Sequence, residues 1–348
     1  MTDLGIVAAG HAERVKNLLQ TEGIDVSVFD RVQENPTTRC VDRCLEMAKE
    51  NKIGAFIGLG GGSSIDTAKG CNFLLTNGGM MKDYWGVGKA TKPMLPLIAI
   101  PTTAGTGSEC QSAALIADEV THQKMACLDS KAAAHIAILD PELTISQPQR
   151  VTACTGIDAI AHAVETAVTT KRNSFSVMYS REAFRLMAKS FSIVLKNPND
   201  LEARGRMLLG AAFAGIAIEN SMLGAAHSAA NPLTAHYGIV HGQAVGMMLP
   251  HVVRFNGEQS DAQTGYADLA ALAGISLASE NKIRWLALID WLNSILDIAQ
   301  MPRSLAGCGV ERVKISQLAE EAAQQWTAKF NPRPITKADF SNLFEAAF

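Results

Sequence analysis

The chain has 348 residues, of which 47% are hydrophobic and 19% are charged, and its formal net charge is -3. This composition is typical of a folded protein with a large buried core and excludes an intrinsically disordered chain. The small negative charge gives no electrostatic basis for binding nucleic acid or an anionic membrane. The length is that of two domains rather than one.

The cysteines and the start of the sequence bear on location. The seven cysteines form no C-x-x-C pair and their number is odd, which is typical of reduced thiols in a cytoplasm. The first residues lack the basic start and apolar core of a signal peptide. No apolar run approaches the ~18 residues that a transmembrane helix needs. We therefore expect a cytoplasmic protein.

The first fifty residues alternate between helical and extended patterns. Residues 5–22 show the apolar spacing of a helix, and residues 24–30 alternate in the manner of a strand. Residues 37–51 form a predicted amphipathic helix.

A glycine-rich loop follows the next predicted strand. Residues 55–59 form a short buried strand that continues into Gly60-Gly61-Gly62-Ser63-Ser64, and a helix is expected to follow. Glycines let backbone N–H groups approach a phosphate, and the positive end of the helix dipole favours an anion. A tight turn without a ligand is the alternative interpretation of this loop alone.

A second loop of this kind follows the strand predicted at residues 95–100. It reads Pro101-Thr102-Thr103-Ala-Gly-Thr-Gly-Ser-Glu109. Ligands of open α/β sheets bind beyond the carboxyl ends of parallel strands, so two such loops together favour a nucleotide site. Neither loop has the G-x-G-x-x-G spacing.

The second half of the chain has a helical pattern. Strand signals end at residues 137–139, and strands first with helices second indicate two separate domains with a boundary near 143–148. We expect the ligand in the cleft between these domains. Helices are predicted at 149–168, 174–195, 199–219, 223–235 and 241–254, with several more between 260 and 347.

One predicted helix carries candidate metal ligands. Asp158 and His162 are four residues apart, so their side chains project from one face of a helix. His227 and His241 follow, and three imidazoles with one carboxylate suit Fe²⁺ or Zn²⁺. A surface ion pair is the alternative for Asp158 and His162 alone. However, residues 153–167 are nearly all small or apolar, and buried charges are rare unless they are paired or bind a metal.

These residues also carry a family resemblance. The pattern Gly156-x-Asp158-Ala-x-x-His162-Ala-x-Glu165, the Ala-His227 segment and His241-Gly resemble the metal-site signature of the iron-containing (group III) alcohol dehydrogenases. With the glycine-rich motifs, the resemblance covers essentially the whole chain. It implies an α/β plus all-α, dehydroquinate synthase-like fold. Residues 1–146 would form a Rossmann-like NAD-binding domain lacking its first strands, and residues 147–348 an all-helical metal-binding domain.

The resemblance also implies the cofactor residues. Gly61, Gly62 and Ser63 would hold the pyrophosphate of NAD, and Thr102 and Thr103 would lie along the cofactor. Lys124 matches a cofactor-contacting lysine, although a solvated lysine at a strand end is an equal alternative.

Asp3 occupies the place of an acidic residue that binds the adenosine ribose. It would repel a 2′-phosphate, which favours NAD over NADP. The alternative is that Asp3 caps the following helix. In this family further residues precede the position of Asp3. We therefore expect either that the start of this chain is placed too late in its gene or that this form binds the cofactor weakly.

The resemblance therefore implies a metal-dependent NAD(P)-linked alcohol dehydrogenase or aldehyde reductase. Its ligands would be Asp158, His162, His227 and His241, with Fe²⁺ as the metal and Zn²⁺ as the alternative. The substrate would be a small alcohol or aldehyde, and the protein a homodimer. The alternatives are a polyol or hydroxy-acid dehydrogenase of the same fold, or a non-catalytic metal-binding relative. Residues expected on the substrate side are Ala113, Ile218, Met222 and Leu223.

One position departs from the family pattern. Many members carry a second histidine four residues after the metal-binding one, where this chain has Asn231. Asparagine does not titrate near neutral pH, whereas histidine does. His236, His251, bound water and the cofactor ribose are the candidates for moving the alcohol proton instead.

Overall fold

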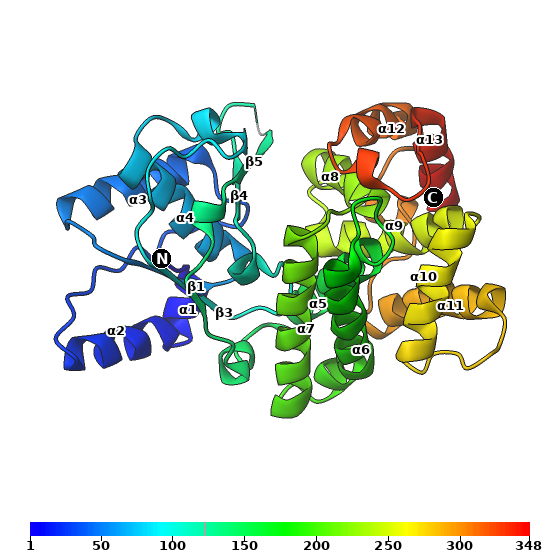
Figure 1. The fold of residues 1–348 in the computed structure, drawn as a ribbon, viewed down its shortest axis with the longest axis horizontal. Helices are drawn as coiled ribbons and strands as arrows, with labels where there is room; N and C mark the ends of the chain where they lie inside the picture. Colours follow the sequence, from blue (N-terminus) through cyan, green and yellow to red (C-terminus); the bar gives the residue numbers. More distant parts are fainter. Residues whose placement is uncertain (122) are drawn as a thin grey trace. The chain divides into compact units, whose positions relative to one another are not determined.

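The protein is described by a computed structural model that covers residues 1–121 and 123–348. The chain divides into two compact units, unit 1 (Met1–Gln147) and unit 2 (Pro148–Phe348). All strands of the described residues lie in unit 1, and unit 2 is built from helices (Figure 1). The expected class, α/β followed by all-α, is confirmed.

Unit 1 contains two small sheets. Strand β3 (Leu97–Pro101) lies between β1 (Phe56–Gly60) and β6 (Ile136–Ala137), and all three are parallel. Because Gly60 pairs with Pro101, the two glycine-rich loops leave the sheet at one edge. The second sheet has the order β2 (Gly86–Val87), β5 (Lys124–Leu128), β4 (Ala113–Ala117), with β4 and β5 antiparallel.

Helix α4 (Gly62–Asn77) is the centre of the unit 1 core. Nearly every residue from Gly62 to Leu74 is buried, because α4 packs against β1, β4 and α3 (Thr38–Glu50). The apolar side chains around it include Val41, Phe56 and Leu97. A helix buried on most sides provides a fixed base for the loop at its start.

Two expectations for the first thirty residues were wrong. The helix predicted at 5–22 is two helices, α1 (Leu4–Ala8) and α2 (His11–Thr21), separated by Gly10 at φ +80°. Glycine adopts this left-handed conformation without a steric cost. Residues 24–30 form no strand; this segment contacts Thr2, whose N–H donates to the Phe29 carbonyl at 2.9 Å.

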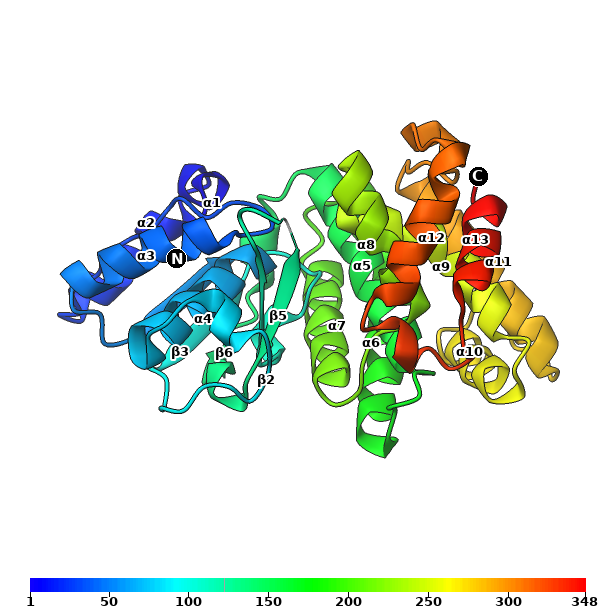
Figure 2. The same cartoon turned by 90° about the horizontal axis from the view of Figure 1, so that it is seen from above.

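Unit 2 follows the predicted helices closely. Helices α6 and α7 lie side by side in both views (Figures 1 and 2). None of the helices in the described part of the chain combines the length and apolar character needed to cross a membrane. The helices are α5 (Gln149–Thr166), α6 (Ser174–Lys196), α7 (Leu201–Glu219), α8 (Ala225–Tyr237), α9 (His241–Asn256), α10 (Ser260–Leu272), α11 (Asn281–Ile298), α12 (Ile315–Gln324) and α13 (Lys337–Ala346).

Many buried residues of α5, α8 and α9 are alanines, and α9 packs against both α5 and α8. Because alanine has a single methyl group, it allows helices to approach closely and loses no side-chain entropy on burial. These buried alanines include Ala159, Ala161 and Ala163 of α5, Ala226, Ala229 and Ala230 of α8, and Ala244 of α9.

Candidate metal site and cofactor loops

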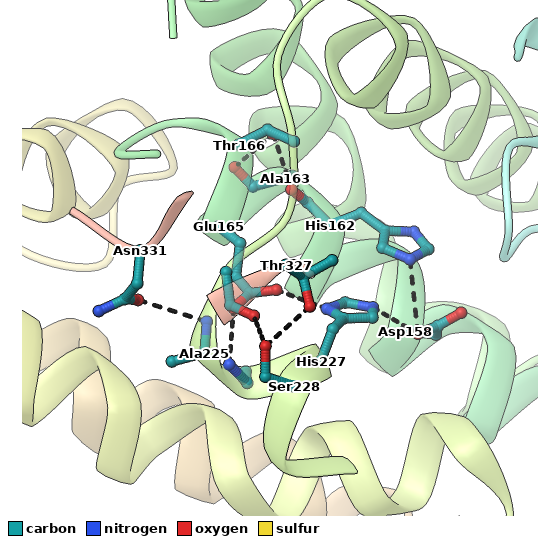
Figure 3. A network of polar contacts seen from close by, with 12 residues as sticks. Asp158, His162, Ala163, Glu165, Thr166, Ala225, His227, Ser228, Thr327 and Asn331 are labelled. Atoms are coloured by element: carbon teal, nitrogen blue, oxygen red, sulfur yellow. Dashed lines mark hydrogen bonds and ion pairs between the residues drawn. The ribbon is translucent and has the colours of Figure 1, made fainter. Parts of the chain in front are cut away.

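Four candidate ligands from three helices meet inside unit 2. Asp158 and His162 lie on α5, His227 lies in the first turn of α8, and His241 is the first residue of α9. The Asp158 Oδ1 atom lies 3.6 Å from Nε2 of His162 and 3.4 Å from Nε2 of His227. It lies 3.9 Å from Nε2 of His241. Figure 3 shows the His162 and His227 rings directed at this carboxylate.

The site is buried except on one side. The side chains of Asp158, His162 and His227 are 8%, 6% and 5% exposed, whereas that of His241 is 26% exposed. One ligand atom each of Asp158, His227 and His241 lies within 4.8 Å of the others. The rings of His162 and His227 are stacked, with centroids 4.8 Å apart. Solvent therefore reaches the group mainly beside His241.

The electrostatics of the group favour a cation between these side chains. Burial alone would raise the pKa of Asp158, but the surrounding imidazoles of His162, His227 and His241 hold it well below its usual range. Burial alone would lower the pKa of His227, but the neighbouring Glu165 and Asp158 carboxylates raise it to about 9. Two buried carboxylates thus place negative potential on the ring of His227.

Two buried polar atoms indicate what this space holds. Neither Asp158 Oδ1 nor His227 Nε2 makes a hydrogen bond to any described residue. Buried polar atoms in folded proteins nearly always have a partner. Imidazole nitrogens with a carboxylate oxygen are ligands for a borderline divalent ion such as Fe²⁺ or Zn²⁺. The residues therefore fit a divalent metal ion.

Glu165 binds the Nδ1 side of the His227 ring, and this role was not predicted from the sequence. Its Oε2 lies 2.5 Å from Nδ1 of His227, and its Oε1 accepts a hydrogen bond from the Ala226 N–H at 2.7 Å. A carboxylate at Nδ1 makes that nitrogen the donor, which leaves the Nε2 lone pair for a metal. Glu165 follows Asp158 by seven residues, so helical spacing alone places the two on one face.

The predicted cofactor loops lie together in unit 1. The Thr102 N–H donates to the Gly60 carbonyl at 3.0 Å. A Cβ added to Gly61 would lie 3.4 Å from Thr103, and one added to Gly62 would lie 2.6 Å from Thr106. The backbones of both loops are therefore close enough to contact one ligand.

Asp3 and Lys124 lie beside these loops. The Asp3 Oδ2 atom lies 3.4 Å from the position of a Cβ on Gly60, while Oδ1 accepts from Gly5 N–H at 2.8 Å. Asp3 is therefore a helix cap and also a neighbour of the loop. The ammonium group of Lys124 donates to Asn35 Oδ1 at 3.4 Å, and the Asn35 N–H donates to Ser63 Oγ at 3.3 Å.

Comparison with known proteins agrees with this architecture. Residues 1–141 match the sequence profile "Iron-containing alcohol dehydrogenase", and residues 152–348 match that of the "Fe-containing alcohol dehydrogenase family, C-terminal". The chain belongs to the iron-containing alcohol dehydrogenase family. It is therefore an oxidoreductase of the alcohol dehydrogenase type.

Individual members of the family align along the whole chain. Alcohol dehydrogenase 4 of Schizosaccharomyces pombe is 36% identical over 347 residues, which span 100% of this chain and 81% of that protein. The NAD-dependent methanol dehydrogenase of Bacillus methanolicus is 32% identical, over 100% and 91% of the two chains. The crystal structure of a 1,3-propanediol oxidoreductase superposes with a TM-score of 0.96 at 30% identity, over 100% of this chain and 91% of that chain.

Residues from the end of the enzyme chain reach the start of α8. The Ala225 N–H donates to Asn331 Oδ1 at 3.3 Å, and the side chains of Asn331 and Asn256 bond to each other at 2.7 and 3.0 Å. Figure 3 shows Asn331 directed at Ala225. Because Asn331 follows Ala225 by more than a hundred residues in the sequence, no local pattern predicts this contact.

A glycine sets the spacing between α5 and α9 of the enzyme. A Cβ on Gly242 would lie 2.0 Å from the Cys154 carbonyl oxygen and 3.3 Å from Cβ of Asp158. No larger residue fits there without moving the backbone. His241, which precedes this glycine, is thereby held next to Asp158.

The position that departs from the family pattern has ordinary partners. Asn231 Nδ2 donates to Gln325 Oε1 at 2.9 Å. His236 is exposed and lies 2.7 Å from a Glu321 carboxylate oxygen. For His251, burial lowers the pKa, and Arg254 lowers it further.

Proposed function

We propose that the chain is a metal-dependent, NAD-linked alcohol dehydrogenase or aldehyde reductase for a small alcohol or aldehyde. The observation that carries this proposal is the convergence of three histidines on Asp158 Oδ1, at 3.4 to 3.9 Å, in a buried site. Family membership supports the reaction type. The proposed ligands are Asp158, His162, His227 and His241, with Fe²⁺ as the first choice and Zn²⁺ as the alternative.

In the proposed mechanism the metal site would activate the hydroxyl group of the substrate, and the cofactor would transfer the hydride. Asp158, His162, His227 and His241 would hold a divalent ion, which would supply a Lewis acid that lowers the pKa of an alcohol hydroxyl group. Glu165 holds Nδ1 of His227 protonated, so that Nε2 keeps its lone pair and its direction. Asp158, His162 and His227 are buried, so little water surrounds them and the charge interactions among them are strengthened. Hydride transfer itself belongs to the nicotinamide.

The proposed cofactor site comprises the loops of unit 1. Gly61, Gly62 and Ser63 at the start of α4 would bind the pyrophosphate, because that helix presents free N–H groups and a positive dipole end. Thr102 and Thr103 would flank it, and Lys124 would contact the cofactor. The methanol dehydrogenase relative is named as NAD-dependent, which supports the same cofactor here.

Asp3 supports NAD over NADP. Its carboxylate lies beside Gly60, at the edge of the sheet from which both loops leave. An acidic group in this place accepts hydrogen bonds from the ribose hydroxyls and repels a 2′-phosphate.

The proposed substrate is a short aliphatic alcohol. Ile218 is buried, Met222 and Leu223 are half-buried, and the last two lie in the segment before α8 that delivers His227. These apolar side chains of unit 2 offer no charged group for a hydroxy acid. A panel of one- to four-carbon alcohols, 1,3-propanediol, glycerol and lactate checks this order of preference, and light scattering checks the predicted homodimer.

The test is metal analysis combined with cofactor titration. Protein purified without oxygen is expected to contain about one Fe or Zn per chain, to bind NADH by fluorescence titration, and to oxidise NADH in the presence of a short aldehyde. His241→Ala should lose most of the metal and the turnover but retain NADH binding, because the loops of unit 1 are unchanged.

The matched control is His236→Ala. It removes an imidazole from the same unit, but His236 pairs with Glu321 and not with Asp158. Metal content and NADH binding should equal those of the wild type. Wild-type protein without metal, or equal metal in the wild type and His241→Ala, would refute the proposal.

A further inference from the structure

A fully buried lysine lies behind the two cofactor loops. Lys69 on α4 is 0% exposed. Its ammonium group donates to the Ser108 carbonyl at 2.7 Å, the Gln111 carbonyl at 2.7 Å and the Ala113 carbonyl at 2.9 Å. It also lies 3.0 Å from Ser108 Oγ. Burying an ammonium group costs free energy unless its N–H donors are hydrogen-bonded. The three carbonyls therefore make the burial of Lys69 possible.

Asp66, one turn earlier on α4, binds the same segment. Its Oδ1 accepts a hydrogen bond from Ser108 Oγ at 2.5 Å, and its Oδ2 accepts one from the Leu115 N–H at 3.1 Å. Asp66 is 7% exposed and Ser108 is 5% exposed. The hydroxyl of Ser108 therefore links the carboxylate and the ammonium group, both carried by α4.

The segment held in this way ends the second cofactor loop. Ser108 N–H donates to Thr106 Oγ1 at 3.2 Å, and Gln111 Nε2 donates to the Thr106 carbonyl at 2.7 Å. Thr106 in turn packs against Gly62, the first residue of α4. Asp66 and Lys69 thus connect the body of α4 to the second loop, while Gly61 to Ser63 at the start of α4 form the first loop.

We propose that Asp66, Lys69 and Ser108 form a positioning clamp that holds the Thr102–Gly107 loop at a fixed distance from the Gly61–Ser63 loop. The clamp touches no reacting atom. It lowers the cost of binding the nicotinamide cofactor, because a loop already held in its bound position loses no further freedom on binding. The inference rests on the proposed function insofar as these loops bind that cofactor.

The residue types suit a clamp of this kind. Lysine supplies three donors on a flexible stem, and here it binds the carbonyls of Ser108, Gln111 and Ala113. Helix α4 is buried on most sides, so it is the fixed part and the loop is the part that is held. A loop that depended on its own contacts would be free to shift, since loop residues are the more mobile parts of a fold.

The test compares two mild variants with the wild type in the full chain. Ser108→Ala removes the hydroxyl that links Asp66 to Lys69, and Asp66→Asn removes the charge while leaving an acceptor. Each should raise the Kd for NADH about tenfold, as expected for one lost charge-assisted hydrogen bond. Metal content per chain should stay unchanged. In steady state, KM for NAD should rise while kcat at saturating NAD stays close to that of the wild type.

The matched control is Asn72→Ala. Asn72 lies on the same helix and is 1% exposed. It also binds a distant backbone segment through two hydrogen bonds, to Leu95 N–H at 3.0 Å and the Leu95 carbonyl at 2.9 Å. That segment precedes β3 and does not form a cofactor loop. Asn72→Ala should lower Tm as much as Ser108→Ala does, yet bind NADH with the affinity of the wild type.

The outcomes separate the clamp from the proposed function. Unchanged NADH affinity in Ser108→Ala and Asp66→Asn, with a wild type that binds NADH, would overturn the clamp alone. An equal loss of affinity in Asn72→Ala would also overturn it, because the effect would then follow general destabilisation. A wild type that binds neither NADH nor NADPH would overturn the assignment of the loops, and the clamp with it.

Discussion

Glu109, which follows Ser108, should make the stability of the protein depend on pH. Its side chain is 4% exposed, and its Oε1 has no hydrogen-bond partner among the described residues. Burial raises the pKa of this carboxyl from 4.5 to about 7, and the nearby Lys69 offsets only part of that effect. Because the folded state holds the proton more tightly than the unfolded state, the free energy of unfolding falls as pH rises from about 4.5 to about 7.

The expected magnitude follows from the shift. The difference between 4.5 and about 7 corresponds to a cost of about 3 kcal/mol once the carboxyl is ionised, and most of this cost accumulates between about pH 5 and pH 8. Glu109→Gln removes the titrating group and keeps its size. Urea unfolding of both proteins at these two pH values should therefore show the variant gaining about 2–3 kcal/mol on the wild type.

Comparing the two proteins at each pH cancels the other titrating groups, which they share. The same pH dependence in wild type and variant would refute the argument, since it would mean that Glu109 is solvated or paired in solution. A variant that gained stability equally at both pH values would also refute it, because only an effect that grows with pH reports the ionisation of Glu109.

Three further variants test the site and the cofactor assignment. Asp3→Asn should lower the preference for NADH over NADPH, measured as the ratio of their KM values, about tenfold. Its Tm should not change, because asparagine caps a helix as well as aspartate does. Glu165→Gln should weaken metal binding about 10- to 100-fold in competition with a chelator, because His227 loses its carboxylate partner; unchanged affinity would contradict that role. Gly242→Ala should cost about 1–3 kcal/mol of stability and reduce the metal content, since its Cβ would overlap the Cys154 carbonyl; an unaltered Tm would show that α5 and α9 separate easily.

Local patterns predicted most of the fold. The glycine loop at Gly60 to Ser64 and the long helices of unit 2 carry strong short-range signals, and the structure has them close to the expected bounds. The strand expected at 24–30 was wrong because alternation of apolar residues predicts a strand only where a partner strand lies alongside. Among the described residues this segment is bonded through Thr2, whose N–H donates to the Phe29 carbonyl, and not through a strand. Gly10 ended a helix that periodicity alone would have continued.

The candidate site was predictable to the extent that its residues share a helix. Asp158 and His162 follow from their spacing, and Glu165 lies on the same face, although its role was missed. His227 and His241 lie on other helices, so no helical spacing joins them to the pair. Their suitability as metal ligands and the family resemblance did so. Asn331 and the clamp around Lys69 depend on contacts between distant segments, and no spacing in the sequence encodes these.

The buried alanines of α5, α8 and α9 have a consequence for the thermodynamics of metal binding. Alanine leaves no long side chain to order, so the three helices pay little conformational entropy to reach the spacing at which the ligands meet. The fold of unit 2 is then supplied by helix packing and not by the metal, in contrast to small zinc domains that fold only around their ion. We expect calorimetric metal binding to show a small heat-capacity change, because little apolar surface remains to be buried when the ion binds.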